Sequence, residues 1–227
     1  MPKVFLVTGT STGFGHDLIQ EVLNRGDIAV ATARKPDTLS FENTTPSNYL
    51  PLKLDVTDKK SIAAAFQQAL KVFKRVDVVV NNAGYNLLGN IEELSDSEFR
   101  KTMDVNVFAM AHIIRNVLPT MRQQKSGHII NTASMMGYMS YPGNGSYSAS
   151  KYAVIGLSEA LAQEVAHFGI KVTILAPGTF RTNFMSEKTL NVAQNKIDTY
   201  NLDKQIEQFT GFDGQQLGNP KKLAEVL

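Results

Sequence analysis

A tyrosine and a lysine, Tyr147 and Lys151, stand four positions apart in the stretch Tyr-Ser-Ala-Ser-Lys. If this stretch opens a helix, both side chains lie on one face, one turn apart. The ammonium group then favours the phenolate and lowers the pKa of the tyrosine from its ordinary value of about 10, so the phenol can exchange a proton near neutral pH. A packed ring beside a solvated amine has the same spacing, so the pair alone does not decide between catalysis and structure.

A glycine-rich turn near the amino terminus has the form of a phosphate-binding loop. The apolar run 4–7 predicts a buried strand, residues 8–15 (TGTSTGFG) form the turn, and an amphipathic helix follows. Gly9 permits the tight turn, Gly13 lets the backbone approach a diphosphate, and Gly15 allows close helix packing, while the helix N-terminus offers free N–H groups to an anion. A plain loop also uses glycines, but the position between strand and helix favours nucleotide binding.

The end of the second predicted strand, residues 28–32, bears on the choice of dinucleotide. A fold that binds NAD(H) places an acid here, on the ribose 2′-hydroxyl. This chain has Arg34 and Lys35 instead, and the nearest acid, Asp37, lies beyond a proline. Two cations suit the 2′-phosphate of NADP(H), so we predict that NADP(H) is preferred over NAD(H) by about tenfold or more. A solvated basic loop is the alternative interpretation.

Small or polar residues follow four further predicted strands, at the edge where parallel sheets bind nucleotides. They are Asp55-Val56 after residues 49–54, Asn81-Asn82-Ala83-Gly84 after 76–80, Ser134 after 128–131, and Pro177-Gly178 after 170–175. The Asp55 carboxylate could accept from an adenine amino group, although an N-cap role for Asp55 or Thr57 is an equal account. A plain turn would likewise explain the Asn and Gly residues.

Two helices are predicted between these strands, over about residues 59–74 and from Ser95 to about Gln124. Ser95 and Glu98 have the form of a capping box, and Pro119 is expected to kink or restart the second helix. Asn106 lies among the apolar residues of that helix. Because a buried amide is costly unless it is hydrogen bonded, we expect Asn106 to hold a backbone group or a water molecule.

The composition favours one domain, residues 1–227, that acts on a small molecule. A chain of 227 residues with 43% hydrophobic residues can bury a full core, and a net charge of +2 without a basic run argues against nucleic acid as partner. The absence of cysteine excludes disulfides and thiolate metal sites, and the histidines lack metal-ligand spacing, so no metal is expected. No run has the length of a membrane span or the form of a signal peptide, and we expect a cytoplasmic protein.

The segment 183–219 is polar, with scattered aromatic residues and weak periodicity. Its position after the last predicted strand favours a lid that covers the substrate. A disordered loop or an ordinary helical hairpin is the alternative.

Taken together, the motifs resemble the short-chain dehydrogenase/reductase family. In chain order they are Thr8-Gly9 with Gly13 and Gly15, Asn81-Asn82-Ala83-Gly84, Asn106, Ser134, Tyr147 with Lys151, and Pro177-Gly178. The resemblance covers residues 3 to about 182. It implies an α/β fold with a Rossmann-like, doubly wound parallel sheet in three layers, strand order 3-2-1-4-5-6-7, and hydride transfer between a nicotinamide and a carbonyl or alcohol.

The resemblance also implies a role for each residue of the site. Tyr147 would be the general acid/base, Lys151 would lower its pKa and bind the nicotinamide ribose, Ser134 would hydrogen-bond the substrate oxygen, and Asn106 would hold a water of a proton relay. The residues expected to contact the cofactor are Gly9, Ser11, Thr12, Gly13, Phe14, Gly15, Arg34, Asp55, Val56, Asn82, Ala83, Gly84, Tyr147, Lys151, Pro177 and Gly178.

Two features depart from the commoner family pattern. Phe14 and the run Tyr85 to Gly89 look more like the hydroxysteroid and retinol dehydrogenase branch, which favours a lipophilic substrate. The chain also ends at Leu227, inside what resembles the start of a helix after Pro220, so we expect the seventh strand to be lacking or truncated. The resemblance implies a homodimer or homotetramer formed through the helices around 97–124 and 147–168.

The leading hypothesis is therefore an NADP(H)-dependent oxidoreductase that interconverts a carbonyl and an alcohol on a small, lipophilic substrate. The alternative is an NADP(H)-binding regulatory or sensor protein on the same fold, without turnover. The presence of Asn106, Ser134, Tyr147 and Lys151 together argues against this alternative, because a protein without turnover has no chemical need for all four.

Overall fold

A parallel six-stranded sheet forms the centre of the computed structural model, which describes residues 1–227. Its strands are β1 Val4–Thr8, β2 Ile28–Ala33, β3 Tyr49–Lys53, β4 Val78–Asn81, β6 Gly127–Thr132 and β7 Ile170–Leu175. They lie in the order β3-β2-β1-β4-β6-β7, which is the first six positions of the expected order, and the sheet ends at β7. The predicted Rossmann-like α/β fold is confirmed.

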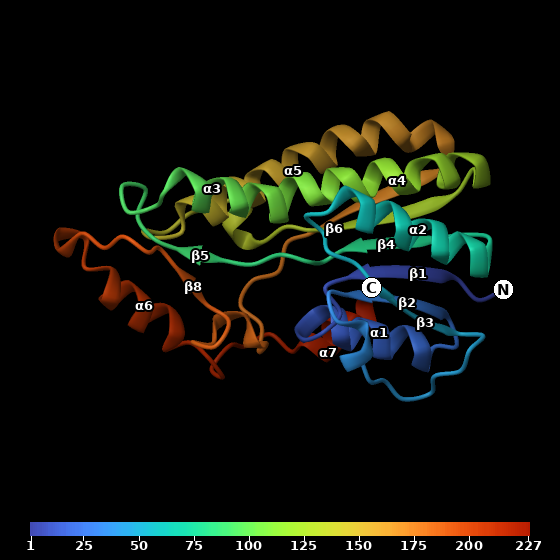
Figure 1. Ribbon diagram of the computed structural model, residues 1–227, viewed down its shortest axis with the longest axis horizontal. Helices are drawn as coiled ribbons and strands as arrows, with labels where there is room; N and C mark the ends of the chain where they lie inside the picture. Colours follow the sequence, from blue (N-terminus) through green and yellow to red (C-terminus); the bar gives the residue numbers. More distant parts are fainter.

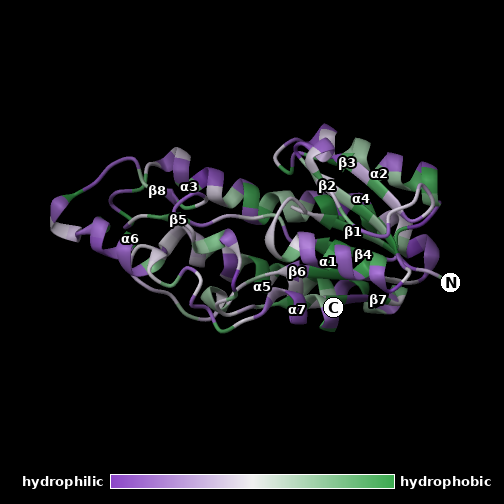
Figure 2. Ribbon diagram, turned by 90° about the horizontal axis from the view of Figure 1, so that it is seen from below, coloured by the Kyte–Doolittle hydropathy of each residue, from purple (hydrophilic) through white to green (hydrophobic).

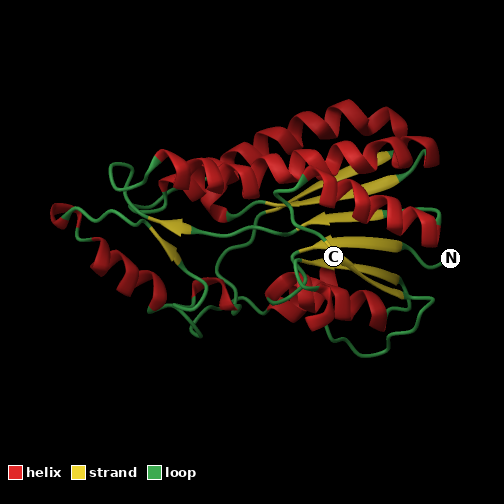
Figure 3. Cartoon of the chain, viewed as in Figure 1, coloured by secondary structure: helices red, strands yellow, loops and turns green.

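Helices cover both faces of this sheet and make three layers (Figures 1 and 3). They are α1 Gly13–Asn24 and α7 Pro220–Val226 on one face, and α2 Lys59–Phe73, α4 Ala109–Gln124 and α5 Gly145–Val165 on the other. Side chains of a strand point alternately to its two faces. Accordingly Val4 and Leu6 of β1 join the cluster under α2, α4 and α5, while Phe5 and Val7 join the cluster under α1 and α7.

Burial on both faces explains why the central strands β1, β2 and β4 are nearly continuous apolar runs. Every residue of β1 is buried, and Figure 2 shows hydrophobic residues concentrated in the sheet and in the helix faces that cover it. None of the helices combines the length and the apolar character that a membrane span requires.

The long helix that begins after Ser95 is interrupted at a different place from the one predicted. It runs as α3 Asp96–Met103, a π-helical turn Asp104–Phe108, and α4. The predicted capping box is confirmed, since the side chains of Ser95 and Glu98 each accept from the other's backbone N–H. Pro119, however, lies within α4 and does not end it. Pro119 and Arg115, whose carbonyl loses its helical donor, are both exposed, so water can satisfy that carbonyl.

A second, small sheet lies beyond the carboxyl ends of the main strands (Figure 1). It pairs β5 Leu87–Leu88 in parallel with β8 Asn191–Val192. The helix α6 Leu202–Thr210 packs beside it, and Leu88, Ala193 and Leu202 form a separate buried cluster. The segment 183–219 therefore contains a short strand and a helix.

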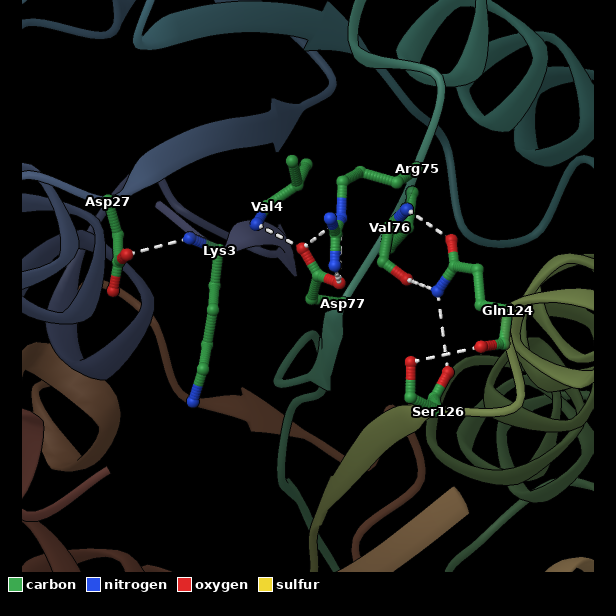
Figure 4. A network of polar contacts seen from close by, with 8 residues as sticks. All are labelled: Lys3, Val4, Asp27, Arg75, Val76, Asp77, Gln124 and Ser126. Atoms are coloured by element: carbon green, nitrogen blue, oxygen red, sulfur yellow. Dashed lines mark hydrogen bonds and ion pairs between the residues drawn. The ribbon is translucent and has the colours of Figure 1, made fainter. Parts of the chain in front are cut away.

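A polar network joins the chain at the amino ends of the main strands (Figure 4). The Asp77 carboxylate accepts a 2.8 Å hydrogen bond from Val4 N and pairs with Arg75 Nη2 at 2.6 Å. The side-chain amide of Gln124 both accepts from and donates to the backbone of Val76, at 3.2 and 3.0 Å. The sequence predicted that this strand begins at Val76, whereas β4 begins at Val78. The backbone of Val76 is paired with the side chain of Gln124 instead of with a neighbouring strand.

Candidate active site

The first turns of α5 carry the tyrosine and the lysine whose spacing suggested chemistry. Both side chains are buried, with Tyr147 7% and Lys151 5% exposed. Lys151 Nζ lies 5.5 Å from the centre of the Tyr147 ring and donates a 2.7 Å hydrogen bond to the carbonyl of Thr132 at the end of β6. The helix thus places a phenol and an amine side by side at the carboxyl edge of the sheet.

Burial shifts the pKa of both groups toward the neutral form. It lowers the pKa of Lys151 to about 8 and raises the pKa of Tyr147 to about 12, while a hydrogen bond with the Ser134 side chain offsets part of the rise of the tyrosine. The expectation of a lowered tyrosine pKa is therefore wrong for the protein without ligands. The loss of water around the phenol dominates, and the amine of Lys151 directs its hydrogen bond at the Thr132 carbonyl and not at the phenol.

Ser134 lies between β6 and the short 3-10 helix Met135–Gly137, which it caps. Its Oγ accepts a 3.1 Å hydrogen bond from Met136 N, which fixes the oxygen and leaves the hydroxyl proton available to another acceptor. The residue is 7% exposed and lies close enough to Tyr147 to influence its pKa. A hydroxyl donor and a phenol therefore converge on the same small space.

Asn106 occupies the π-helical turn and bonds to protein atoms through both ends of its amide. Its Oδ1 accepts from Tyr85 N at 3.1 Å, and its Nδ2 donates to Tyr85 O and to Ser150 Oγ, both at 3.0 Å. Of the two predicted partners, the backbone group is thus present. A Cβ atom on Gly84 would lie 3.1 Å from Asn106 Oδ1 and 3.7 Å from Lys151 Nζ, so this glycine keeps the space between them open.

The glycine-rich turn has the shape and the free donors that a diphosphate requires. Gly9 and Gly13 have φ values of +70° and +61°, and a Cβ on Gly15 would lie 2.4 Å from Gly9 O. The side chain of Thr12 does not cap α1, and the first turn of that helix contains no acid. The N–H groups of α1 therefore remain available to an anion, and the residues present fit the dinucleotide that the fold implies.

Arg34 and Asp55 are the two positions expected near the adenosine part of the dinucleotide. They differ in whether their side chains already bond to other residues of the chain. Arg34 follows β2, is exposed, and has no hydrogen bond or ion pair within the chain. Asp55 Oδ1 accepts from Thr57 N at 2.9 Å and from Thr57 Oγ1 at 2.7 Å, and these bonds hold the pKa of Asp55 below its ordinary value. The N-cap of α2 is Asp58, so the alternative cap role for Asp55 or Thr57 is wrong.

The remaining predicted positions line the same edge. The Asn82 side chain donates to the carbonyls of Thr8 and Gly9, at 3.0 and 3.1 Å, which ties the end of β4 to the glycine turn. Pro177 O accepts from Met135 N at 3.0 Å and thereby joins the end of β7 to the segment after Ser134. The other positions predicted to contact the cofactor lie near the same edge, with Ser11, Ala83 and Gly178 in these turns, Val56 after β3, and Phe14 in the first turn of α1.

Comparison with known proteins agrees with this geometry. Residues 3–193 match the family described as short chain dehydrogenase. The chain belongs to the short-chain dehydrogenase family. Oxidoreductase BOA17 of Botryotinia fuckeliana is 35% identical over 229 residues, covering 100% of this chain and 84% of that protein. The 3-ketodihydrosphingosine reductase of Bacteroides thetaiotaomicron is 38% identical over 199 residues, covering 88% of this chain and 72% of that protein.

Solved structures of the family support the same fold and a nicotinamide cofactor. A short-chain dehydrogenase from Streptomyces avermitilis has a TM-score of 0.88 at 36% identity, covering 100% of this chain and 82% of that one. ElxO with NADP bound has a TM-score of 0.79 at 27% identity, covering 100% and 90% of the two chains. The 3-ketoacyl-(acyl-carrier-protein) reductase from Brucella melitensis, complexed with NADH, has a TM-score of 0.82 at 26% identity, covering 99% and 88%. This short-chain dehydrogenase is an oxidoreductase that acts on CH–OH groups with NAD(P).

The sequence named Thr8 only as part of the glycine motif, and it did not reveal how Thr8 and Thr132 organise the site. Thr8 Oγ1 accepts from Asn82 N and Ala83 N, at 3.0 and 3.1 Å, and so shapes the turn after β4. Thr132 supplies the carbonyl that holds Lys151. A hydroxyl residue directly after the predicted strand 4–7 was a usable signal for Thr8. The role of Thr132 has none, because any residue provides a backbone carbonyl.

Proposed function

We propose that this short-chain dehydrogenase interconverts a carbonyl and an alcohol on a small, lipophilic substrate and prefers NADP(H) over NAD(H). The observation that carries the proposal is the convergence of Tyr147, Ser134 and Lys151 at the carboxyl edge of the sheet, beside the uncapped N-terminus of α1. The bound dinucleotide supplies or accepts the hydride, and the chain's own groups handle the proton and the orientation of the substrate.

In this proposal Tyr147 donates a proton to the carbonyl oxygen during reduction and takes it back during oxidation. Its raised pKa keeps the phenol protonated in the free protein, which suits the donor role. The Ser134 hydroxyl orients the same oxygen by a hydrogen bond. Lys151, held by Thr132, stands where it can favour the phenolate that remains, and Asn106 borders the open space at Gly84 where a relay water could lie.

The cofactor preference rests on Arg34 and the lack of an acid after β2. Arg34 is exposed and its guanidinium makes no hydrogen bond or ion pair in the chain, although its charge helps to lower the pKa of Asp55, so it can pair with a 2′-phosphate. We expect kcat/KM with NADPH to exceed that with NADH by about tenfold or more. Arg34→Ala should bring the ratio close to unity, whereas Lys171→Ala, at the opposite edge of the sheet, should leave it unchanged. Equal values for the two cofactors in the wild type would overturn the preference.

Three observations favour a lipophilic substrate and a covering role for residues 183–219 within one domain, 1–227. The Phe184 ring lies 5.8 Å from the Tyr147 ring, between centres. The two ends of the segment meet, since Arg181 N donates to Gly218 O at 3.0 Å and Gly218 N to Thr179 O at 3.1 Å. The name of the Bacteroides thetaiotaomicron relative also gives a ketone of a lipid as its substrate.

Turnover with a small panel of carbonyl compounds tests the proposed function. Purified protein is mixed with NADPH and decanal, acetophenone, nitrobenzaldehyde or 3-ketodihydrosphingosine, and the loss of NADPH is followed by absorbance. We expect faster oxidation with the long-chain compounds than with nitrobenzaldehyde. Binding of NADPH without oxidation by any compound would favour the regulatory alternative.

We also expect a homodimer or homotetramer, with α4 and α5 at its interface. The exposed apolar residues Phe108, Tyr152 and Leu157 lie on or next to these helices and support this expectation. Light scattering of the purified protein measures the mass, and a monomer at micromolar concentration would contradict it.

A further inference from the structure

A buried carboxylate outside the catalytic set, Glu93, lies between β5 and α3. It is 1% exposed. Its Oε2 accepts from Asn90 N at 3.0 Å and from Asn90 Nδ2 at 2.8 Å, and its Oε1 accepts from Ile197 N at 2.9 Å. A buried charge is costly unless it is hydrogen bonded, so these charge-assisted bonds are the reason that the group can remain here. One of them reaches the segment proposed to cover the substrate.

The residues just before Glu93 hold the same covering segment by a second contact. β5 pairs with β8 through Leu87 and Asn191 and through Leu88 and Val192, and Ala193 N donates to Leu88 O at 2.8 Å. The β5–β8 pairing and the Glu93 bond thus fix the segment on both sides of Ala193.

On their other side, residues 86–89 fix the start of the catalytic helix. Gly89 N donates to Gly143 O at 2.8 Å, and Asn86 Nδ2 donates to Asn144 Oδ1 at 3.0 Å. Ser146 Oγ also lies within 3.5 Å of Leu87 O. Tyr147 is the next residue along α5. One short piece of chain therefore touches both the covering segment and the turn that carries the proposed acid.

We propose that Glu93 is a positioning residue of the substrate site. Through Ile197 it holds the covering segment, residues 183–219, beside β5, and the chain around β5 also fixes the first turn of α5. The inference rests on the proposed function. It assigns Glu93 to substrate binding and not to the transfer of a proton or hydride, because no contact joins Glu93 to Tyr147, Ser134 or Lys151.

The neighbouring glutamate provides a matched comparison. Glu92 is exposed, and its carboxylate accepts a 2.7 Å hydrogen bond from Tyr200 OH in the same covering segment. Water can replace an exposed partner at little cost, whereas the N–H groups that Glu93 satisfies would be left without acceptors in a buried place. The two residues are therefore expected to differ in effect although both reach the covering segment.

The test compares Glu93→Gln with Glu92→Gln in the full chain. Glutamine keeps the volume but turns an N–H group toward at least one of the former donors. Hydrogen exchange of peptides within 191–200 should become about tenfold faster in Glu93→Gln, while β1 and β4 keep the wild-type rate. KM for decanal should rise by about tenfold with the Kd of NADPH within about twofold of wild type. Glu92→Gln should stay within about twofold in all three measurements.

Each outcome has a distinct meaning. Unchanged hydrogen exchange in 191–200 would show that Glu93 does not hold the covering segment. Faster exchange with an unchanged KM would overturn the positioning role. A rise in both KM and the Kd of NADPH would indicate a merely structural role. If Glu93→Gln does not fold, Asn90→Ser removes one donor and keeps the charge, and about threefold faster exchange is expected. No turnover of any compound by the wild type would refute the proposed function. The hydrogen-exchange rates would still test whether Glu93 holds the covering segment.

Discussion

The two ends of the central sheet use polar side chains in opposite ways. At the amino end, Asp77 binds Val4 N and Arg75, and Gln124 binds both backbone groups of Val76, so polar groups satisfy each other (Figure 4). At the carboxyl end, Thr132 Oγ1 and Asn81 Oδ1 are buried without a hydrogen-bond partner, and α1 has no capping side chain. The amino-end network therefore contributes stability, while the uncapped N–H groups of α1 at the carboxyl end stay available to a ligand.

The strongest test of this contrast is Tyr147→Phe at the carboxyl end. It should lower kcat by at least about a hundredfold, because it removes the proposed proton donor, and leave the Kd of NADPH within about twofold. Steady-state kinetics and a cofactor titration measure both. Tyr138→Phe, at a tyrosine that is 62% exposed, is the control and should keep wild-type turnover. Retained activity in Tyr147→Phe would contradict the assignment.

At the amino end, Asp77→Ala should affect stability and spare the chemistry. It leaves Val4 N–H buried without an acceptor and removes the partner of Arg75, so the free energy of unfolding should fall by about 2–3 kcal/mol with little change in KM. Urea unfolding measures this. Asp96→Ala breaks an exposed ion pair with Arg100 and should lower the free energy of unfolding far less than Asp77→Ala does. Equal losses in the two variants would refute the role of the Asp77 network.

A smaller, pH-dependent effect should appear at the carboxyl end. The pKa of Lys151 falls from 10.5 to about 8 on folding, so between these values the unfolded chain binds more protons than the folded one. The contribution of Lys151 to stability is therefore complete above pH 10.5 and is lost as the pH falls toward 8. Between pH 10 and pH 8 the free energy of unfolding should fall by about 2 kcal/mol. Urea unfolding of wild type and Lys151→Met at these two pH values measures it. The same pH dependence in both proteins would contradict the assignment to Lys151.

Residue types and spacing were sufficient to predict the parts of the molecule that depend on neighbours in the chain. The strand, glycine turn and helix over residues 4–24, the capping box at Ser95, and the placement of Tyr147 one turn from Lys151 all follow from local rules of backbone and side-chain geometry. The order of the main strands was implied by the family resemblance and is confirmed.

Features that depend on contacts distant in the chain could not be predicted. The strands β5 and β8 have two residues each, too few for a periodic signal, and they meet only because the fold brings residues 87–88 and 191–192 together. The burial of Glu93 has the same origin. Pro119 also leaves its helix unbroken because Pro119 and Arg115 lie on the exposed side of it, where water reaches the unpaired carbonyl.

The sequence by itself determined which residues could do chemistry and on which elements they lie. Tertiary structure decided the burial, the hydrogen bonding and the pKa of these residues. The spacing of Tyr147 and Lys151 indicates that an ammonium lowers the pKa of the phenol, yet packing buries both groups, directs Lys151 toward the Thr132 carbonyl, and raises the pKa of Tyr147 to about 12. The physical reason is that a pKa depends on the water that surrounding elements exclude, and that exclusion is a property of the whole fold.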